Sequence, residues 1–280
     1  MSVAGGLHLA FDRIREVRGR ALQIFTRNQR QWSASPVTEK EAELFRLAWK
    51  EWGEFPVVTH NSYLINLASP KSEVTRRSLT ALRDELVRSD ALGIPFVIMH
   101  PGAHLGSGLE QGLERFAENI DQVFRAAGSA NRVSILLETT SGQGTSLGSS
   151  FEEIARLINA SQFSERLGVC LDTCHVFAAG YDFRTPETYK ATFQAFASII
   201  GLERLKFVHL NDSLKGLGSK VDRHTHIGKG KIGLAGFKLL MNDPRFARLP
   251  MALETPKGED LREDKENLAI LKGLIKKSVG

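Results

Sequence analysis

Short apolar runs that end in polar side chains recur along the chain, and each is followed by a segment with apolar residues at helical spacing. The seven runs are ALQIFTRN (21–28), FPVVTHN (55–61), PFVIMHPG (95–102), VSILLETT (133–140), GVCLDTCH (168–175), KFVHLND (206–212) and PMALETP (250–256). A short, nearly continuous apolar run is typical of a strand that is buried on both faces of a parallel sheet. The pattern therefore predicts seven buried strands.

Helices are predicted between these strands, at residues 38–52, 74–92, 108–127, 150–159 and 186–200, and in the C-terminal segment NLAILKGLIKK. Thr38 with Glu41, and Ser150 with Glu153, have the spacing of capping boxes. Pro186 suits the first turn of a helix. The regular alternation of strand and helix indicates an α/β fold, and favours a TIM-type (β/α) barrel over an open sheet.

Composition adds little to this picture. The chain has 280 residues, of which 42% are hydrophobic and 25% are charged, and no change in composition marks a linker, so we expect one domain over residues 1–280. No apolar run is long enough to cross a membrane, and the first residues do not resemble a signal peptide. We therefore expect a soluble cytoplasmic protein without membrane contact, and a monomer.

The charge and the cysteines set weak limits on function. A net charge of +5 and a pI near 9.2 mildly favour a polyanionic partner such as nucleic acid. Cys170 and Cys174 have the spacing of neither a zinc ribbon nor a redox pair, so we expect both thiols to be reduced and to lie in the core or near the site.

Side chains with metal-ligand chemistry follow the strands. The C-terminal ends of barrel strands form the active-site face. Asp222 and His224 alternate in the loop after the sixth strand, so an extended backbone turns both to the same side. One histidine at a strand end is usually structural, but nine ligand-type side chains on one face indicate a site for ions of the zinc or manganese class. The nine are His60, His100, Glu138, Asp172, His175, His209, Asp222, His224 and Glu254.

Other polar loops have simpler interpretations. GKGKIG (228–233) matches G-x-G-x-x-G, but it does not follow a strand, so we expect a flexible basic loop and no dinucleotide site. Tyr63 and Leu64 are expected to form an exposed apolar pair at a strand end, and Arg30 lies near Trp32 in another loop. Several basic residues lie in or near loops of the same face, where phosphates could run: Arg27, Lys215, Lys220, Arg223, Lys229, Lys231 and Lys257.

Motifs along the whole chain have a familiar order. HNSYLINL (60–67), HPG (100–102), LET (137–139), LDTCH (171–175), VHLND (208–212), DRHTHIG (222–228) and LETP (253–256) together resemble the endonuclease IV family of apurinic/apyrimidinic (AP) endonucleases. The resemblance runs from near Ala4 to the C-terminus. It implies a TIM-type barrel that binds three divalent metal ions, usually Zn²⁺, with Mn²⁺ as the alternative at one or more sites.

The resemblance also implies residue roles. His60, His100 and Glu138 would hold the first ion. Glu138, Asp172, His209 and Glu254 would hold the second, with Glu138 as the bridging, catalytic ligand, and His175, Asp222 and His224 would hold the third. Arg30, Tyr63 and Leu64 match positions that insert into damaged DNA. The implied substrate is double-stranded DNA with abasic sites or blocked 3′ ends, cut 5′ to the abasic site to leave a 3′-hydroxyl.

Charge alone supports such chemistry. Three divalent ions and four carboxylates leave about +2 on the cluster, which attracts a phosphodiester. Paired ions about 3.5–4 Å apart lower the pKa of a shared water toward about 7, so a separate general base is not required. Two alternatives stay open: a metal-dependent sugar isomerase or epimerase of the same barrel class, and a non-catalytic DNA-binding protein with structural metals.

One departure from the family concerns the first strand. Members normally begin with a strand ending in Gly-x-His-x-Ser, whereas this chain starts with MSVAGG. A barrel without that strand should have a gap between the strand at 22–25 and the strand at 251–253, with unpaired backbone on both edges. A start codon placed too late and a natural seven-stranded member both remain as explanations.

Overall fold

Seven parallel strands form a single curved sheet in a computed structural model that describes residues 1–128, 130 and 132–276. Neighbouring strands in the sheet follow chain order, and every pair is parallel. The predicted TIM-type barrel is therefore confirmed. The strands are β1 (Leu22–Ile24), β2 (Val57–His60), β3 (Phe96–Met99), β4 (Ser134–Glu138), β5 (Leu167–Asp172), β6 (Leu205–His209) and β9 (Met251–Ala252).

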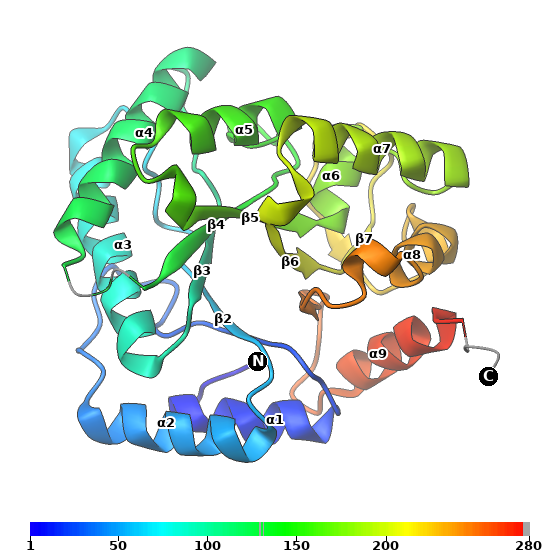
Figure 1. The fold of residues 1–280 in the computed structure, drawn as a ribbon, viewed down its shortest axis with the longest axis horizontal. Coiled ribbons are helices and arrows are strands. Elements are labelled where there is room, and N and C mark those ends of the chain that lie inside the picture. Colours follow the sequence, from blue (N-terminus) through cyan, green and yellow to red (C-terminus); the bar gives the residue numbers. More distant parts are fainter. Residues whose placement is uncertain (129, 131, 277–280) are drawn as a thin grey trace.

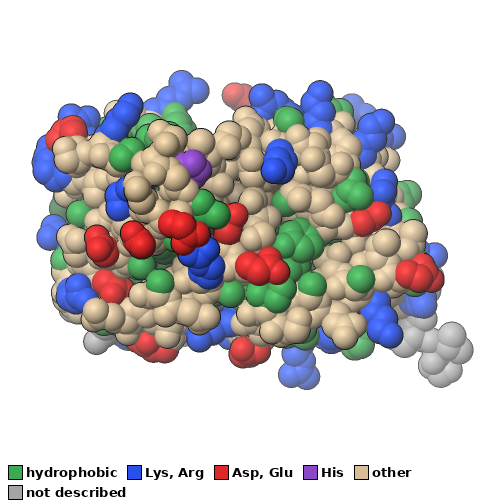
Figure 2. Space-filling model, turned by 90° about the horizontal axis from the view of Figure 1, so that it is seen from above, with side chains coloured by type: hydrophobic (Ala, Val, Ile, Leu, Met, Phe, Trp, Pro, Cys, Tyr) green, Lys and Arg blue, Asp and Glu red, His purple; other side chains and the backbone are tan. Residues whose placement is uncertain are grey.

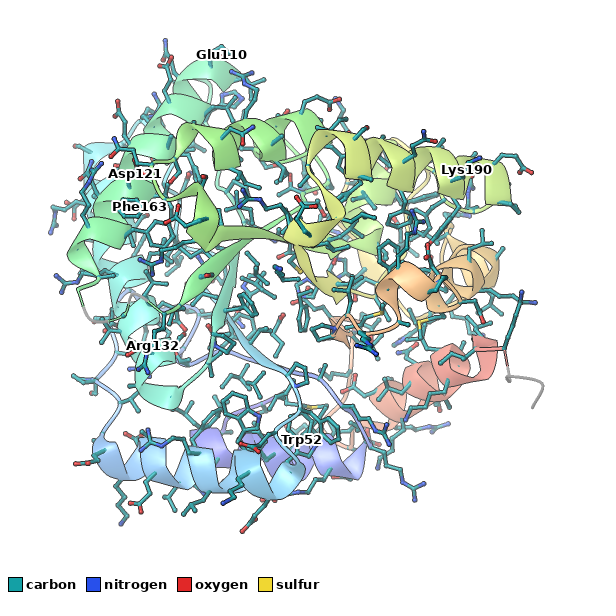
Figure 3. All side chains as sticks on the ribbon, viewed as in Figure 1. Trp52, Glu110, Asp121, Arg132, Phe163 and Lys190 are labelled. Carbon is teal, nitrogen blue, oxygen red and sulfur yellow. The ribbon has the colours of Figure 1, made fainter. Side chains whose placement is uncertain are left out.

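Helices surround this sheet on its outer side, as Figure 1 shows. The six predicted helices are confirmed, five of them to within two residues at both ends. The C-terminal helix begins earlier than the predicted segment 267–277, and residue 277 lies outside the described residues. They are α2 (Glu39–Trp52), α3 (Ser72–Leu92), α4 (Leu109–Ala126), α5 (Phe151–Ala160), α7 (Pro186–Ile199) and α9 (Arg262–Leu274). Trp52 points from α2 toward the strands and packs against Phe11 and Phe55 (Figure 3).

The helix starts follow the predicted capping chemistry with one exception. Thr38 and Glu41 form the complete reciprocal box, and Pro186 occupies the first turn of α7. Ser150 accepts a hydrogen bond from the Glu153 backbone N–H, but the Glu153 carboxylate accepts from the N–H groups of Gly148 and Ser149. The reciprocal half of the predicted box at Ser150 is therefore wrong, because the preceding loop uses that carboxylate.

Three helices and one antiparallel strand pair were not predicted. They are α1 (Ala10–Glu16), α6 (Thr173–Ala179), α8 (Gly233–Met241) and the antiparallel pair β7 (Asp212–Ser213) and β8 (His224–Thr225). Short 3₁₀ turns also occur at Leu7–Leu9, Ser164–Arg166, Leu202–Arg204 and Pro244–Phe246.

The loop 228–233 is organised around one buried carboxylate. Asp212 accepts hydrogen bonds from the backbone N–H groups of Gly228, Gly230, Ile232 and Gly233, at 2.9–3.3 Å. A β-carbon at Gly230 would lie only 2.4 Å from the Asp212 carboxylate, so this backbone approach requires glycine. The prediction of a flexible loop is therefore wrong. Hydrogen bonds from its backbone N–H groups to Asp212 hold the loop, and β7 and β8 anchor it.

Apolar side chains fill both sides of the sheet. The barrel interior contains one cluster, contributed by consecutive strands: Val58, Ile98, Leu136, Cys170 and Phe207. A larger cluster lies between the sheet and the outer helices. Cys170 and Cys174 are both free and buried, as predicted.

The predicted gap in the barrel is confirmed. β1 and β9 are the two edges of the sheet, and no pairing joins them in the part of the chain that the structure describes. Residues 1–10 form no strand there; they run through a turn and the 3₁₀ segment Leu7–Leu9 into α1. A cavity of about 70 Å³ lies at this seam, between residues of β1 and of β9.

Candidate metal centre

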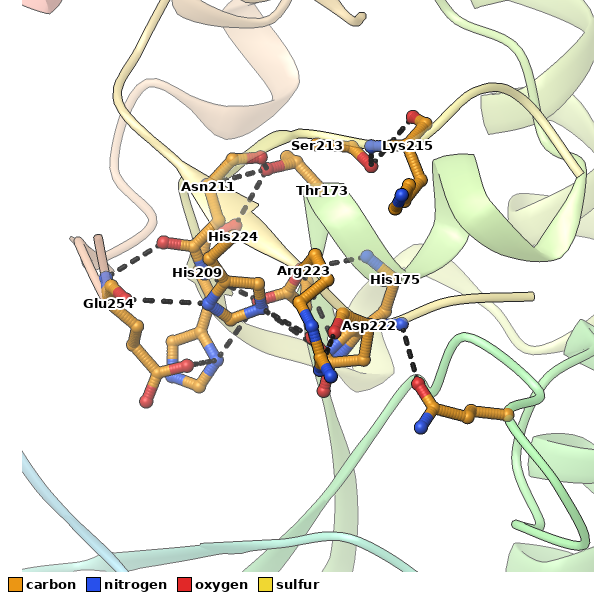
Figure 4. Close-up of polar contacts among 12 residues, drawn as sticks. Thr173, His175, His209, Asn211, Ser213, Lys215, Asp222, Arg223, His224 and Glu254 are labelled. Carbon is orange, nitrogen blue, oxygen red and sulfur yellow. Dashed lines mark hydrogen bonds and ion pairs between the residues drawn. The ribbon is translucent and has the colours of Figure 1, made fainter. Parts of the chain in front are cut away.

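The nine predicted ligands all lie at the C-terminal face of the barrel. His60, Glu138, Asp172 and His209 are the last residues of β2, β4, β5 and β6, and His100 directly follows β3. Side chains at the ends of adjacent parallel strands necessarily converge, because the strand ends form one rim. Glu254 follows β9, and Figure 4 shows it next to His209.

The side chains gather in three groups that match the predicted sets. Within each group, one ligand atom of every member lies within 4.8 Å of those of the others. The groups are His60, His100 and Glu138; then Glu138, Asp172, His209 and Glu254; and then His175, Asp222 and His224. A fourth combination, Asp172, Cys174 and His224, has the same spacing and was not predicted, because Cys174 was expected in the core or near the site but not as a ligand.

Glu138 lies at the centre of the cluster and is fully buried. Its Oε2 atom is 2.9 Å from His60 Nε2 and 3.0 Å from His100 Nε2. Its Oε1 atom is 2.9 Å from His209 Nδ1 and 3.4 Å from His175 Nδ1. One carboxylate thus turns one oxygen toward the first group and the other oxygen toward the second.

The third group is compact and partly open to solvent. Asp222 lies 3.1 Å from His175 Nε2 through one oxygen and 3.3 Å from His224 Nε2 through the other. The two Nε2 atoms are 3.3 Å apart (Figure 4), so two imidazole nitrogens and one carboxylate face the same small space. Asp172 begins α6 and accepts a hydrogen bond from the His175 backbone N–H, which places this histidine beside the second group.

The cluster shifts the pKa values of its members strongly. Burial alone would raise the pKa of the Glu138 carboxyl, but the imidazoles of His100 and His209 outweigh it and hold the pKa well below its usual range. Burial would lower the pKa of the His175 imidazole, yet the carboxylates of Asp172, Asp222 and Glu138 raise it well above its usual range. Burial would also raise the pKa of Asp222, but the hydrogen bond and charge of His175 lower it to about 2. Carboxylates so arranged stay ionised and draw positive charge.

Polar residues around the ligands set their orientation, and sequence reasoning missed these roles. Asn211 donates to the Asp172 carboxylate at 2.6 Å and accepts from the Glu254 backbone N–H at 2.8 Å. Gln143 accepts from the Asp222 backbone N–H at 2.9 Å. Such partners hold ligand side chains in place before an ion binds. Asn211 follows His209 and Leu210 at a strand end, and this position in the sequence could have identified it as a residue that orients the ligands.

The predicted DNA-inserting residues lie in two adjacent loops. Arg30 is exposed in the loop after β1, Tyr63 is 63% exposed in the loop after β2, and Leu64 is half-buried. Ser62 donates from Oγ to the Gln29 carbonyl at 2.6 Å and joins the two loops. Arg30 and Tyr63 line the same cavity, of about 490 Å³. Of the two side chains that were expected to be exposed, Tyr63 is exposed and Leu64 is only partly exposed.

Two of the basic residues expected to face phosphates are engaged in ion pairs. The Arg27 side chain is buried and contacts Asp84 at 2.9 Å and Glu85 at 3.0 Å, so its predicted surface role is wrong. Lys257 contacts Asp264 at 3.0 Å. On the face seen in Figure 2, Lys and Arg side chains are mixed with Asp and Glu side chains, both at the edges and nearer the middle, so charges of both signs share that face.

The donor set fits divalent cations of the zinc or manganese class. Imidazole nitrogens and carboxylate oxygens are the ligands such ions prefer. The four carboxylates and five imidazoles form groups whose ligand atoms lie within 4.8 Å of one another, so one cation could contact all the members of a group at once. The fold and the site therefore define a TIM-type barrel protein with a candidate metal centre at the C-terminal face of its strands.

Comparison with known proteins identifies the family. A family model described as "Xylose isomerase-like TIM barrel" matches residues 11–274. Proteins named "Probable endonuclease 4" from Chloroflexus aggregans and Geobacter sulfurreducens are 52% and 50% identical, over 99% of this chain and 96% and 93% of their own lengths. The crystal structure of endonuclease IV from Thermus thermophilus is 37% identical with a TM-score of 0.87, covering 98% of this chain and 96% of that one. The chain belongs to the endonuclease IV family, as its motifs predicted.

More distant structures share the barrel alone. A D-psicose 3-epimerase from Clostridium cellulolyticum is 13% identical, with a TM-score of 0.70 over 97% of this chain.

Among the described residues, no helix is both long and apolar enough to cross a membrane.

Proposed function

We propose that the protein is a metal-dependent DNA repair endonuclease, which hydrolyses the phosphodiester 5′ to an abasic site and leaves a 3′-hydroxyl. It also clears blocked 3′ ends, by the same reaction at a terminal phosphate. The observation that carries the proposal is Glu138, a fully buried carboxylate with one oxygen toward each of two donor groups. Membership of the endonuclease IV family supports the same reaction.

Three ions are assigned to the three donor groups, with Zn²⁺ as the preferred metal and Mn²⁺ as the alternative. Glu138 belongs to the first and second groups, so it would be the ligand that two ions share, and the partly exposed Asp222 lies in the third group, where substrate can approach. When bound, such ions supply charge neutralisation for a phosphate and an activated water. Strands β2 to β6 and β9 each contribute a ligand at or just after their ends, which supports treating residues 1–280 as one domain. A cytoplasmic monomer completes the proposal.

The chain itself positions the groups and keeps them charged. Asn211 and Gln143 hold Asp172, Glu254 and Asp222 through side-chain and backbone hydrogen bonds that need no movement when substrate arrives. The low pKa values of Glu138 and Asp222 keep both carboxylates ionised at neutral pH. Preorganised charge of this kind acts most strongly in a site from which water is excluded.

The assay that tests the proposal uses a duplex with one abasic analogue, beside an undamaged duplex and a set of ketohexoses. We expect one nick, 5′ to the abasic site, with a 3′-hydroxyl end, and no reaction on the other substrates. An unsaturated sugar on the 3′ end would indicate lyase chemistry and contradict the hydrolytic mechanism. Turnover of a ketohexose without nicking would favour the isomerase or epimerase alternative.

Arg30, Tyr63 and Leu64 are proposed to hold DNA with the damaged nucleotide out of the stack. Unstacking costs a few kcal/mol, which inserted side chains can offset. Replacing Tyr63 and Leu64 with alanine should weaken binding to abasic duplex more than binding to a flexible single strand. Equal losses on both substrates would refute insertion.

A further inference from the structure

Gln23 of β1 reaches the metal-type donors from the edge of the sheet. It is 8% exposed, and its Cα is in register with Val58, a member of the apolar cluster inside the barrel. Its amide therefore occupies an interior position that the neighbouring strands fill with hydrocarbon. Buried polar side-chain atoms are normally hydrogen-bonded, so the partners of this amide indicate its role.

Both ends of the amide contact predicted ligands. Gln23 Nε2 donates to Glu254 Oε1 at 2.7 Å, and Gln23 Oε1 lies 2.6 Å from His209 Nε2. An ionised carboxylate can only accept, so the amide nitrogen faces Glu254 and the amide oxygen must accept the N–H of His209. The proton of the neutral His209 ring is then on Nε2. Its Nδ1 lone pair is left facing Glu138 Oε1 at 2.9 Å and Glu254 Oε2 at 3.3 Å.

These contacts also cross the seam of the barrel. Gln23 lies on the edge strand β1, whereas His209 ends β6 and Glu254 follows the other edge strand, β9. No backbone pairing joins β1 to β9 among the described residues, so this amide supplies a polar link between the two edges at the level of the donors.

We propose that Gln23 is a positioning residue for the second donor group: it sets the ring tautomer of His209 and the orientation of Glu254. The inference rests on the proposed function, because it concerns ligands of the proposed metal centre. A single amide does both tasks, since it accepts at one end and donates at the other. Leucine fills a similar volume but can neither accept from His209 nor donate to Glu254. Glutamate can accept from His209 but cannot donate to Glu254.

The test compares the unaltered chain with Gln23→Leu, Gln23→Glu and a matched control. Asn119→Leu serves as the control, because Asn119 is also a buried amide but donates to the Leu67 carbonyl, outside the donor groups. Retention of Zn²⁺ against a competing chelator is measured for each protein. Outer contacts of this kind change metal affinity by about 10–100-fold, and we expect a loss of that size for both Gln23 variants and none for Asn119→Leu.

A second readout separates positioning from simple loss of stability. In ¹⁵N-histidine spectra of the zinc-loaded protein, the His209 Nε2–H signal should be protected from exchange in the unaltered chain and in Gln23→Glu, and exposed in Gln23→Leu. If Gln23→Leu does not fold, zinc retention is compared only between the unaltered chain and Gln23→Glu, and reduced retention in Gln23→Glu supports the proposal. Unchanged zinc retention in a folded Gln23 variant would overturn the inference. An unaltered chain that retains no metal would instead overturn the proposed function.

Discussion

Glu138 illustrates how much a single residue decides in this protein. It ends β4, is fully buried, and contacts histidines from four other segments of the chain. A buried carboxylate without partners would take up a proton, because desolvation penalises its charge. Here the surrounding imidazoles keep its pKa low, so its charge is available to cations.

Glu138→Gln should abolish turnover while the protein remains folded. A neutral amide fills the same volume, but its nitrogen cannot act as a ligand between two donor groups. Nicking of abasic duplex and metal content per chain are measured together with the circular dichroism spectrum. Retention of most of the rate with full metal content would show that Glu138 is not the bridging ligand.

Gly230→Ala should destabilise the protein by about 1–3 kcal/mol, the usual cost of an overpacked site. A β-carbon there would lie 2.4 Å from the Asp212 carboxylate and from the Ser213 carbonyl oxygen. Gly216→Ala is the matched control in a neighbouring loop, because nothing lies within 4 Å of its β-carbon position. Urea unfolding measures both variants, and equal midpoints would contradict the close approach.

At the scale of elements, helix α3 holds the loop that carries Arg30. Arg88 of α3 donates to Thr26 Oγ1 and to the carbonyl oxygens of Thr26 and Ser35. Glu85 of the same helix accepts from Thr26 and pairs with the buried Arg27. Arg88 and Glu85 thus hold both ends of the loop 26–35, because their hydrogen bonds reach Thr26 at one end and Ser35 at the other.

Arg88→Met should lower the stability of the protein by about 1.5–3 kcal/mol, the range for losing hydrogen bonds to a charged group. It should also speed amide hydrogen exchange in residues 28–34, because their two anchors at Thr26 and Ser35 are lost. Arg83→Met is the control, since Arg83 is exposed on the same helix. Equal unfolding midpoints for Arg88→Met and Arg83→Met would contradict the anchoring role of Arg88.

For the whole molecule, the seam makes the barrel's stability uneven. β1 and β9 are each paired on one side only, while β4 and β5 are paired on both. A buried parallel sheet normally leaves few backbone N–H and C=O groups without a hydrogen-bond partner, because burying an unpaired backbone group costs free energy.

Amide exchange should therefore be faster in residues 22–24 and 251–252 than in residues 135–137. Edge strands open with less free energy than central ones, because fewer hydrogen bonds break. Native-state hydrogen exchange measured by mass spectrometry with short peptides resolves the two regions. Equal protection would mean that the seam is closed in solution.

The sequence by itself determined the architecture and the composition of the metal-type centre. Buried strands, amphipathic helices and polar strand ends are local patterns, and a barrel brings all strand ends to one rim, so His60, Glu138 and Glu254 could be placed together without coordinates.

Only the tertiary structure decided how the polar side chains are paired. Arg27 appeared to be a surface cation, but it is buried against helix α3, where it contacts Asp84 and Glu85, the latter 58 residues further along the chain. Gln23 interrupts an apolar strand, and its partners lie 186 and 231 residues away. Hydrogen bonds and ion pairs depend on distances of a few ångströms between groups remote in sequence, and spacing along the chain carries no information about those distances.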